Sequence, residues 1–252
     1  MEWELIWSDE FDKDGLPDTD KWQYEETGPV KNEAFELFQN YTASRTENAR
    51  CEKSCLVLEA RKEKYNDSRY TSASLFSNTS WKYLKIEARA KLPKGVGIWP
   101  AIWMLPEGFT GEGWPQCGEI DIVEHIGQKP GEIYFNVNTG SFNIMMGTAK
   151  GKHLHINDLY DEFHKYSIEW TEEKMGFFLD DTLTFEFKKE SNDINDWPFD
   201  KPFFLKLMLS VGLLYDFNDG GSEVDDAIFP AQMVVDYVRI YKYKLTEVRE
   251  GS

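Results

Sequence analysis

Cysteine is scarce in this sequence, and long apolar runs are absent. The three cysteines, Cys51, Cys55 and Cys117, form neither a disulfide framework nor a zinc-binding spacing. Cys51 and Cys55 are near enough to pair across a short turn, and that pairing stays open at this stage. No apolar stretch reaches 18 residues, so we expect no membrane-spanning helix.

Positive charge is also in short supply. The chain has 28 Lys and Arg against 45 Asp and Glu, which gives a formal net charge of −17. So acidic a chain repels phosphate backbones, which excludes nucleic acid as a partner and disfavours anionic membranes and polysaccharides. The charge is compatible with a neutral substrate, and it also serves solubility.

Signals of export or of further domains are missing as well. The chain opens on MEWELIWSDEF, without a basic and then apolar leader. This is how an exported domain reads once its signal is removed, so we expect a secreted, periplasmic or cell-surface protein. With no linker or repeat, residues 1–252 are predicted to form one domain, and the polar end at 244–252 to be a frayed tail. A monomer is expected.

What the sequence does have is a period of two. Apolar residues alternate with polar ones over 84–92, 205–211 and 237–241, as in half-buried strands. The stretch Gly176 to Phe187 predicts a hairpin that turns at Asp180 and Asp181. Aromatics make up 15% of the chain, which fits either a β-rich core or a ring-lined groove for a flat ligand such as a sugar. Short strands between turn residues predict an all-β sandwich or barrel.

One predicted strand carries three acidic residues in the stretch GEIDIVEHIG. Glu119 and Asp121 share one face, whereas strict alternation would turn Glu124 to the other. One extra residue near Ile122 and Val123, a β-bulge, returns Glu124 to the face of the other two acids. The sequence therefore predicts three carboxylates in a row on the open face of a sheet.

Such a row suits the hydrolysis of glycosidic bonds. Like charges so close raise one another's pKa, a cost that a purely structural strand would avoid. A retaining glycosidase uses one carboxylate as nucleophile and a second as acid and base, about 5–5.5 Å apart. Two long glutamates that flank Asp121 can meet this distance, and Asp121 can help set their pKa values. An exposed acidic strand or a calcium site is the alternative.

The stretch GEIDIVEHIG resembles the bulged active-site signature of glycoside hydrolase family 16, in its laminarinase-like form. Similar segments follow in family order along nearly the whole chain, among them WSDEF at 7–11, GIWPAIWMLP at 97–106 and FHKYSIEW at 163–170. The resemblance implies a jelly-roll β-sandwich (concanavalin A-like) of two curved antiparallel sheets with an open concave cleft. It also implies Glu119 as nucleophile, Asp121 as assisting acid and Glu124 as acid/base, with no cofactor required for the chemistry.

Other site residues follow from the same resemblance. Trp99, Trp103 and Trp114 are similar to aromatics that line the cleft, where a ring face stacks on a sugar. Asn32, in KNEAFELFQ, resembles part of a sugar-binding loop. Glu10 and Asp236 resemble residues that bind a structural calcium.

The departures from the family pattern concern the substrate. Asn138, which we expect to bind substrate, stands where laminarinases usually have a histidine. Ser74 stands where many members have arginine, and Met208 and Leu213 where Asn and Gly are usual. We expect a retaining endo-β-glycosidase acting on β-1,3- or mixed-linkage glucan. The alternatives are an endo-β-galactosidase that cleaves N-acetyllactosamine repeats of mucin-type or keratan glycans, and a non-catalytic glucan-binding module.

Overall fold

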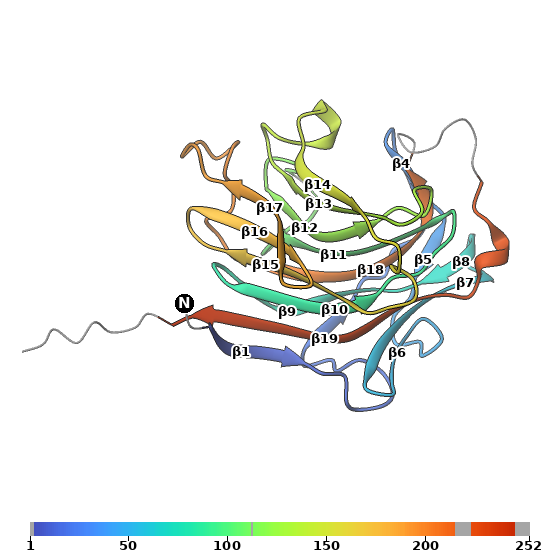
Figure 1. The fold of residues 1–252 in the computed structure, drawn as a ribbon. Helices are drawn as coiled ribbons and strands as arrows, with labels where there is room; N and C mark the ends of the chain where they lie inside the picture. The colour runs from blue at the N-terminus through green and yellow to red at the C-terminus, as the bar shows by residue number, and fades with distance from the viewer. Residues whose placement is uncertain (1–2, 112, 215–222, 245–252) are drawn as a thin grey trace, which may run out of the picture.

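The chain folds into two stacked antiparallel sheets (Figure 1). The computed structural model describes residues 3–111, 113–214 and 223–244. One sheet has nine strands among these residues: β2 (Trp22–Tyr24), β3 (Val30–Lys31), β4 (Phe35–Leu37), β9 (Ser74–Trp81), β11 (Ile98–Pro106), β12 (Glu119–His125), β13 (Glu132–Asn138), β14 (Lys150–His155) and β18 (Phe203–Leu214). Its main path runs β14-β13-β12-β11-β18-β4-β3, so the acidic strand β12 lies inside the sheet between β11 and β13.

The second sheet lies across the core from the first. It has ten strands among the described residues: β1 (Trp3–Asp9), β5 (Gln39–Tyr41), β6 (Ala49–Glu52), β7 (Cys55–Tyr65), β8 (Ser68–Ser72), β10 (Lys85–Lys91), β15 (His164–Trp170), β16 (Lys174–Leu179), β17 (Thr182–Lys188) and β19 (Ala231–Tyr243). Its one parallel pair is β5 with β8. Two short 3-10 helices complete the described structure: η1 (Ile144–Met146) and η3 (Asp226–Ile228). The comparisons below confirm the predicted jelly-roll sandwich.

The period-two reading is confirmed where it was strongest. Residues 85–91 and 205–211 fall on β10 and β18, and the apolar residues of the two patterns are buried. In β18 the alternating polar residues Lys206 and Ser210 are buried as well, so this strand is covered on both faces. The predicted hairpin forms from β16 and β17, and it turns at Asp180 and Asp181. Both turn residues have positive φ, 47° and 68°, a conformation that aspartate tolerates better than most residues.

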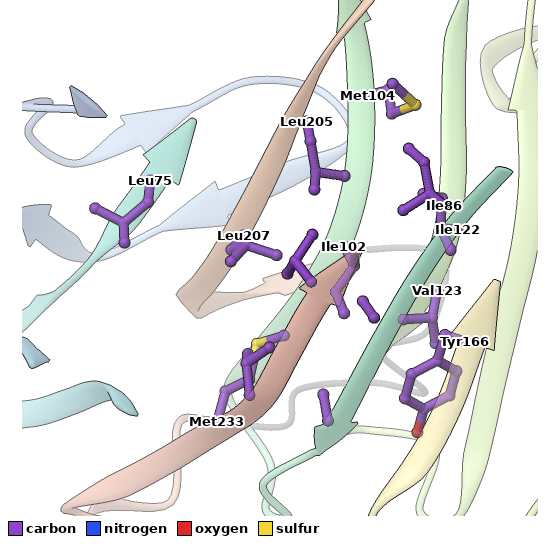
Figure 2. Packing of buried hydrophobic residues seen from close by; sticks show 14 of the residues in the cluster. Leu75, Ile86, Ile102, Met104, Ile122, Val123, Tyr166, Leu205, Leu207 and Met233 are labelled. Carbon is purple, nitrogen blue, oxygen red and sulfur yellow. The ribbon is translucent and has the colours of Figure 1, made fainter. Parts of the chain in front are cut away.

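The core fills the space between the sheets and fixes which face of β12 is free. Figure 2 shows side chains of both sheets meeting there, with Ile86 and Tyr166 from one sheet near Ile122 and Val123 from the other. All four side chains are fully buried. Because the apolar residues of β12 are used by the core, its acidic residues are left on the opposite face.

The fold also bears on three expectations about the cysteines, membrane-spanning helices and the C-terminal tail. Cys51 and Cys55 lie on the paired strands β6 and β7, yet all three cysteines are free, so the pairing left open does not form. Among the described residues, no helix is long and apolar enough to cross a membrane. The predicted frayed tail at 244–252 lies, apart from its first residue, outside the described residues.

Candidate active site

The predicted bulge is present in β12. Asp121 lies opposite Trp103 on β11, and Val123 lies opposite Ile102, the residue just before Trp103. Ile122 has no counterpart on β11, so it is the extra residue. The register against β13 shifts at the same place, between Asp121 and Glu124. Two consecutive residues, Ile122 and Val123, therefore both point into the core. The bulge places Glu119, Asp121 and Glu124 on one face of the nine-stranded sheet, which we call the carboxylate face.

Glu119 is held by two donors, from the loop before β12 and from β13. The Asn138 amide nitrogen Nδ2 donates to Glu119 Oε1 at 2.8 Å, and the Trp114 indole Nε1 donates to Oε2 at 3.1 Å. The same Asn138 nitrogen lies 3.2 Å from Asp121 Oδ2. The amide nitrogen of Asn138 thus bridges the two carboxylates and orients them. Substrate binding by Asn138 stays a prediction.

Glu124 has a matching pair of donors. The Trp99 indole Nε1 donates to Glu124 Oε1 at 3.0 Å, and the Asn136 Nδ2 donates to Oε2 at 3.1 Å. Each glutamate is thus fixed by one tryptophan and one asparagine. Trp99 and Trp114 were expected to stack on sugar, and the structure gives their N–H groups this second task. Sequence reasoning missed Asn136, although Asn136 and Asn138 share one face of β13.

Trp103 lies between the carboxylates and β18. Its indole packs with Trp99 against a small apolar cluster of Tyr41, Ala101 and Met208. The Lys206 amine lies 4.7 Å from the centre of a Trp103 ring. The Trp103 Nε1 is buried and has no hydrogen-bond partner among the described residues. We call these residues the floor beside the carboxylates. They are mostly apolar or aromatic, and Lys206 is their charged member.

Asn32 lies in the turn between β3 and β4. Its Oδ1 accepts hydrogen bonds from the backbone N–H groups of Ala34 and Phe35, at 2.8 and 2.9 Å. The ring of Phe35 meets Trp99 edge to face, with centroids 5.7 Å apart. The side-chain oxygen of Asn32 is thus used to shape the turn that places Phe35 against Trp99. Sugar binding by Asn32 stays a prediction.

The two residues expected to bind calcium are both engaged by arginines. Glu10 accepts from Arg239 Nε at 2.9 Å and from Arg239 Nη2 at 2.8 Å, and Asp236 is paired with Arg89. No group of three or more His, Cys, Asp or Glu among the described residues is arranged to hold a metal ion. A guanidinium on each carboxylate repels a cation, so these side chains do not fit a calcium site as they stand. The arrangement of these two side chains therefore does not support the calcium prediction.

The electrostatics of the carboxylate face oppose full ionisation. Burial raises the pKa of Glu119, Asp121 and Glu124. For Glu119, burial and then repulsion from Glu124 raise the pKa to about 8, although its two hydrogen bonds and the charge of Lys206 lower it. Asp121 is 3% exposed, and after burial the charges of both glutamates raise its pKa. The three groups do not all ionise at neutral pH, so the site retains a proton that it can donate.

This arrangement predicts that the site costs stability. The pKa of Asp121 is higher in the folded than in the unfolded chain, so stability is lost as pH rises above the ordinary carboxyl value of about 4, and no cost is present below it. Asp121→Asn removes the cost and can still accept the Asn138 hydrogen bond. We expect it to raise the Tm at pH 7 by about 2–8 °C, for about 1–2 kcal/mol. Calorimetry at pH 7 and pH 4 checks this, and a lower Tm at pH 7, or a gain equal at both pH values, would contradict it.

Comparison with protein families gives one match that covers most of the chain. Residues 33–238 match the profile of the family described as Glycosyl hydrolases family 16. The whole carboxylate strand and all its hydrogen-bond donors lie within the matched range.

Comparison with individual proteins agrees. The chain is 44% identical over 250 residues to a "Beta-glucanase" of Rhodothermus marinus, covering 96% of this chain and 86% of the relative. The X-ray structure of the laminarinase from Rhodothermus marinus superposes with a TM-score of 0.89 at 43% identity, covering 97% of this chain and 99% of that one. A "Keratan-sulfate endo-1,4-beta-galactosidase" of Sphingobacterium multivorum is 34% identical, over 97% of this chain and 56% of that protein.

Proposed function

This chain belongs to glycosyl hydrolases family 16, and from that premise we propose that it cleaves internal β-1,3-linkages of a neutral glucan, with retention of configuration. The observation that carries the mechanism is the bulge in β12, which places three carboxyl groups on one face beside tryptophan side chains. The glucan substrate is supported by the 44% identity with the Rhodothermus marinus β-glucanase.

The proposed reaction has two steps, each with inversion at the anomeric carbon. In the first, Glu119 attacks that carbon while Glu124 protonates the departing glycosidic oxygen, which forms a covalent glycosyl-enzyme. In the second, Glu124 takes a proton from water, and the water attacks the same carbon and releases Glu119. Trp114 and Asn138 hold the attacking carboxylate, and Trp99 and Asn136 hold the proton donor.

A second candidate is an endo-β-galactosidase. The residues that depart from the laminarinase-like pattern support it, because Met208 adds an apolar side chain to the floor at the position opposite Ala101, which itself lies opposite Glu124. A galactoside carries its O4 hydroxyl axially and needs different neighbours from a glucoside. The relative from Sphingobacterium multivorum supports it too, at lower identity. The non-catalytic alternative is not supported, since both glutamates are present.

The test is a product profile on laminarin, mixed-linkage β-glucan and unsulfated keratan, with Glu119→Ala as the control. We expect oligosaccharides from laminarin that are absent with the variant. Products from keratan alone would move the assignment to the galactosidase. The absence of products from all three polymers would overturn the glycosidase assignment for these substrates.

Three further properties belong to the proposal. The net charge of −17 supports a neutral polymer over a sulfated one. We propose that the protein acts outside the cytoplasm, because its expected polymeric substrate is too large to enter a cell, and that it acts as a monomer. The proposed steps require no cofactor.

A further inference from the structure

A buried lysine lies on the carboxylate face and has no assigned task. Lys206 is on β18, where its neighbours Leu205 and Leu207 point into the core and are fully buried. Strand alternation therefore turns Lys206 to the other face, yet its side chain is only 9% exposed. Buried lysines are rare unless their charge is compensated, so the surroundings of this amine matter.

Two groups fix the Lys206 amine. Its Nζ lies 2.9 Å from Glu25 Oε2, and 4.7 Å from the centre of a Trp103 ring. Glu25 is itself held by a backbone hydrogen bond of 2.9 Å to Ser74, on the strand next to β18. An ammonium over an indole face is attracted by the ring's negative π-cloud. The lysine is thus tethered on one side by a carboxylate and on the other by an aromatic ring.

Lys206 lies in line with the carboxylates across the sheet. Lys206 lies opposite Trp103, and Trp103 lies opposite Asp121, so the three residues form one row across three neighbouring strands. Neighbouring strands are about 4.8 Å apart, so the backbone of Lys206 is about 10 Å from that of Asp121. Trp103 lies between them, and a charge acts more strongly across an aromatic side chain than across water.

Several other titratable groups surround Glu119, and the lysine must be weighed against them. Four of them interact with Glu119 itself: Asp121, Glu124, Cys117 and Lys206. Three more adjoin these groups, because Lys201 acts on Cys117, Tyr134 is affected by Glu124, and Glu25 bonds Lys206. Lys206 is the cation among them whose charge lowers the pKa of Glu119, whereas Glu124 raises it. The nucleophile needs such a cation because only its ionised form attacks.

We propose that Lys206 is a positioning residue for the nucleophile: its ammonium, held by Glu25 and Trp103, favours the ionised form of Glu119 against burial and against the charge of Glu124. This inference rests on the proposed function. It adds β18 to the strands β11, β12 and β13 that already supply groups to the site, and it gives Trp103 a task besides contact with sugar.

The experiment is the pH dependence of kcat/KM on laminarin for the wild type and four variants. Lys206→Met keeps the aliphatic stem but removes the charge, and we expect it to move the acidic limb upward by about one pH unit, the size expected for a unit charge about 10 Å away. Below that limb, kcat/KM then falls about tenfold relative to wild type. Lys206→Arg restores the charge, so its limb stays near the wild-type position.

Glu25→Gln is the matched control. It breaks the same ion pair but leaves the ammonium in place, so its acidic limb does not move upward. If the pair were only structural, Lys206→Met and Glu25→Gln would behave alike. Identical shifts in these two variants, or an unmoved limb in Lys206→Met, would overturn the proposal. Lys206→Gln provides a second neutral variant in case methionine at this position prevents folding, which circular dichroism reports.

A titration without substrate separates this inference from the proposed function. Carbon-13 NMR of protein labelled at the glutamate carboxyls follows Glu119 directly, with its signal assigned by Glu119→Gln. We expect the Glu119 midpoint to rise in Lys206→Met even if none of the tested glucans is cut. A wild-type enzyme that cuts laminarin, combined with an unmoved midpoint in the variant, would retain the proposed function and reject the role of Lys206.

Discussion

Glu119→Ala is expected to lower the hydrolysis of laminarin by about 10⁴-fold or more, because the covalent half of the reaction is lost. The side chain lies on the carboxylate face, away from the core residues Ile120 and Ile122, so the fold should be kept. Loss of one buried acid from three should even raise stability at pH 7, since burial raises its pKa. Reducing-sugar release and the Tm measure the two effects.

Azide makes the Glu119 prediction more specific. A small anion in the space left by the carboxylate attacks the anomeric carbon from the same side, while Glu124 still protonates the leaving oxygen. The product expected from Glu119→Ala is therefore an α-glycosyl azide. As a control, Glu132→Gln changes a half-buried acid on the neighbouring strand β13, whose carboxylate accepts a hydrogen bond from Tyr134. Glutamine can accept the same bond, so we expect the rate to stay within about twofold. No azide product, or equal losses in both variants, would contradict the assignment.

Glu124→Ala should produce a loss that depends on the leaving group. General acid catalysis contributes about 10²–10⁴-fold, so we expect a loss of that size on laminarin, whose leaving sugar must be protonated. A laminari-oligosaccharide with a dinitrophenolate leaving group needs no proton to depart, so the formation of the glycosyl-enzyme from it should be nearly unaffected. Stopped-flow release of dinitrophenol measures this step.

The second half of the reaction gives the matching stereochemical result. Without Glu124, water attacks the glycosyl-enzyme slowly, and added azide attacks it in place of water. The product expected from Glu124→Ala is a β-glycosyl azide, the opposite anomer to that from Glu119→Ala. Equal losses on laminarin and on the dinitrophenyl substrate would show that Glu124 is not the proton donor.

The row of carboxylates was predictable from the sequence because its strand breaks the alternation of polar and apolar residues at one point. Glu119 and Asp121 fit strict alternation and Glu124 does not, and a single extra residue resolves the conflict. The structure confirms that extra residue as Ile122. The hairpin at Asp180 and Asp181 was predictable for a similar reason, since its turn is defined by adjacent residues.

What the sequence did not reveal depends on the orientation of side chains from distant strands. Trp99 and Trp114 were recognisable as residues near the site, but the direction of an indole N–H depends on tertiary packing. Lys206 reads as one polar member of an alternating strand, and its partner Glu25 is 181 residues away in the chain. The pairing of Glu10 with Arg239, which does not fit the expected calcium site, is likewise non-local.

The most direct test of the account is the anomeric form of the first product that the wild-type protein releases from laminarin, followed by proton NMR before mutarotation. The carboxylate row on β12, with Glu119 as nucleophile, predicts that the new reducing end appears first as the β-anomer and then equilibrates. A first product in the α-form would mean a single displacement by water, and would contradict the role of Glu119.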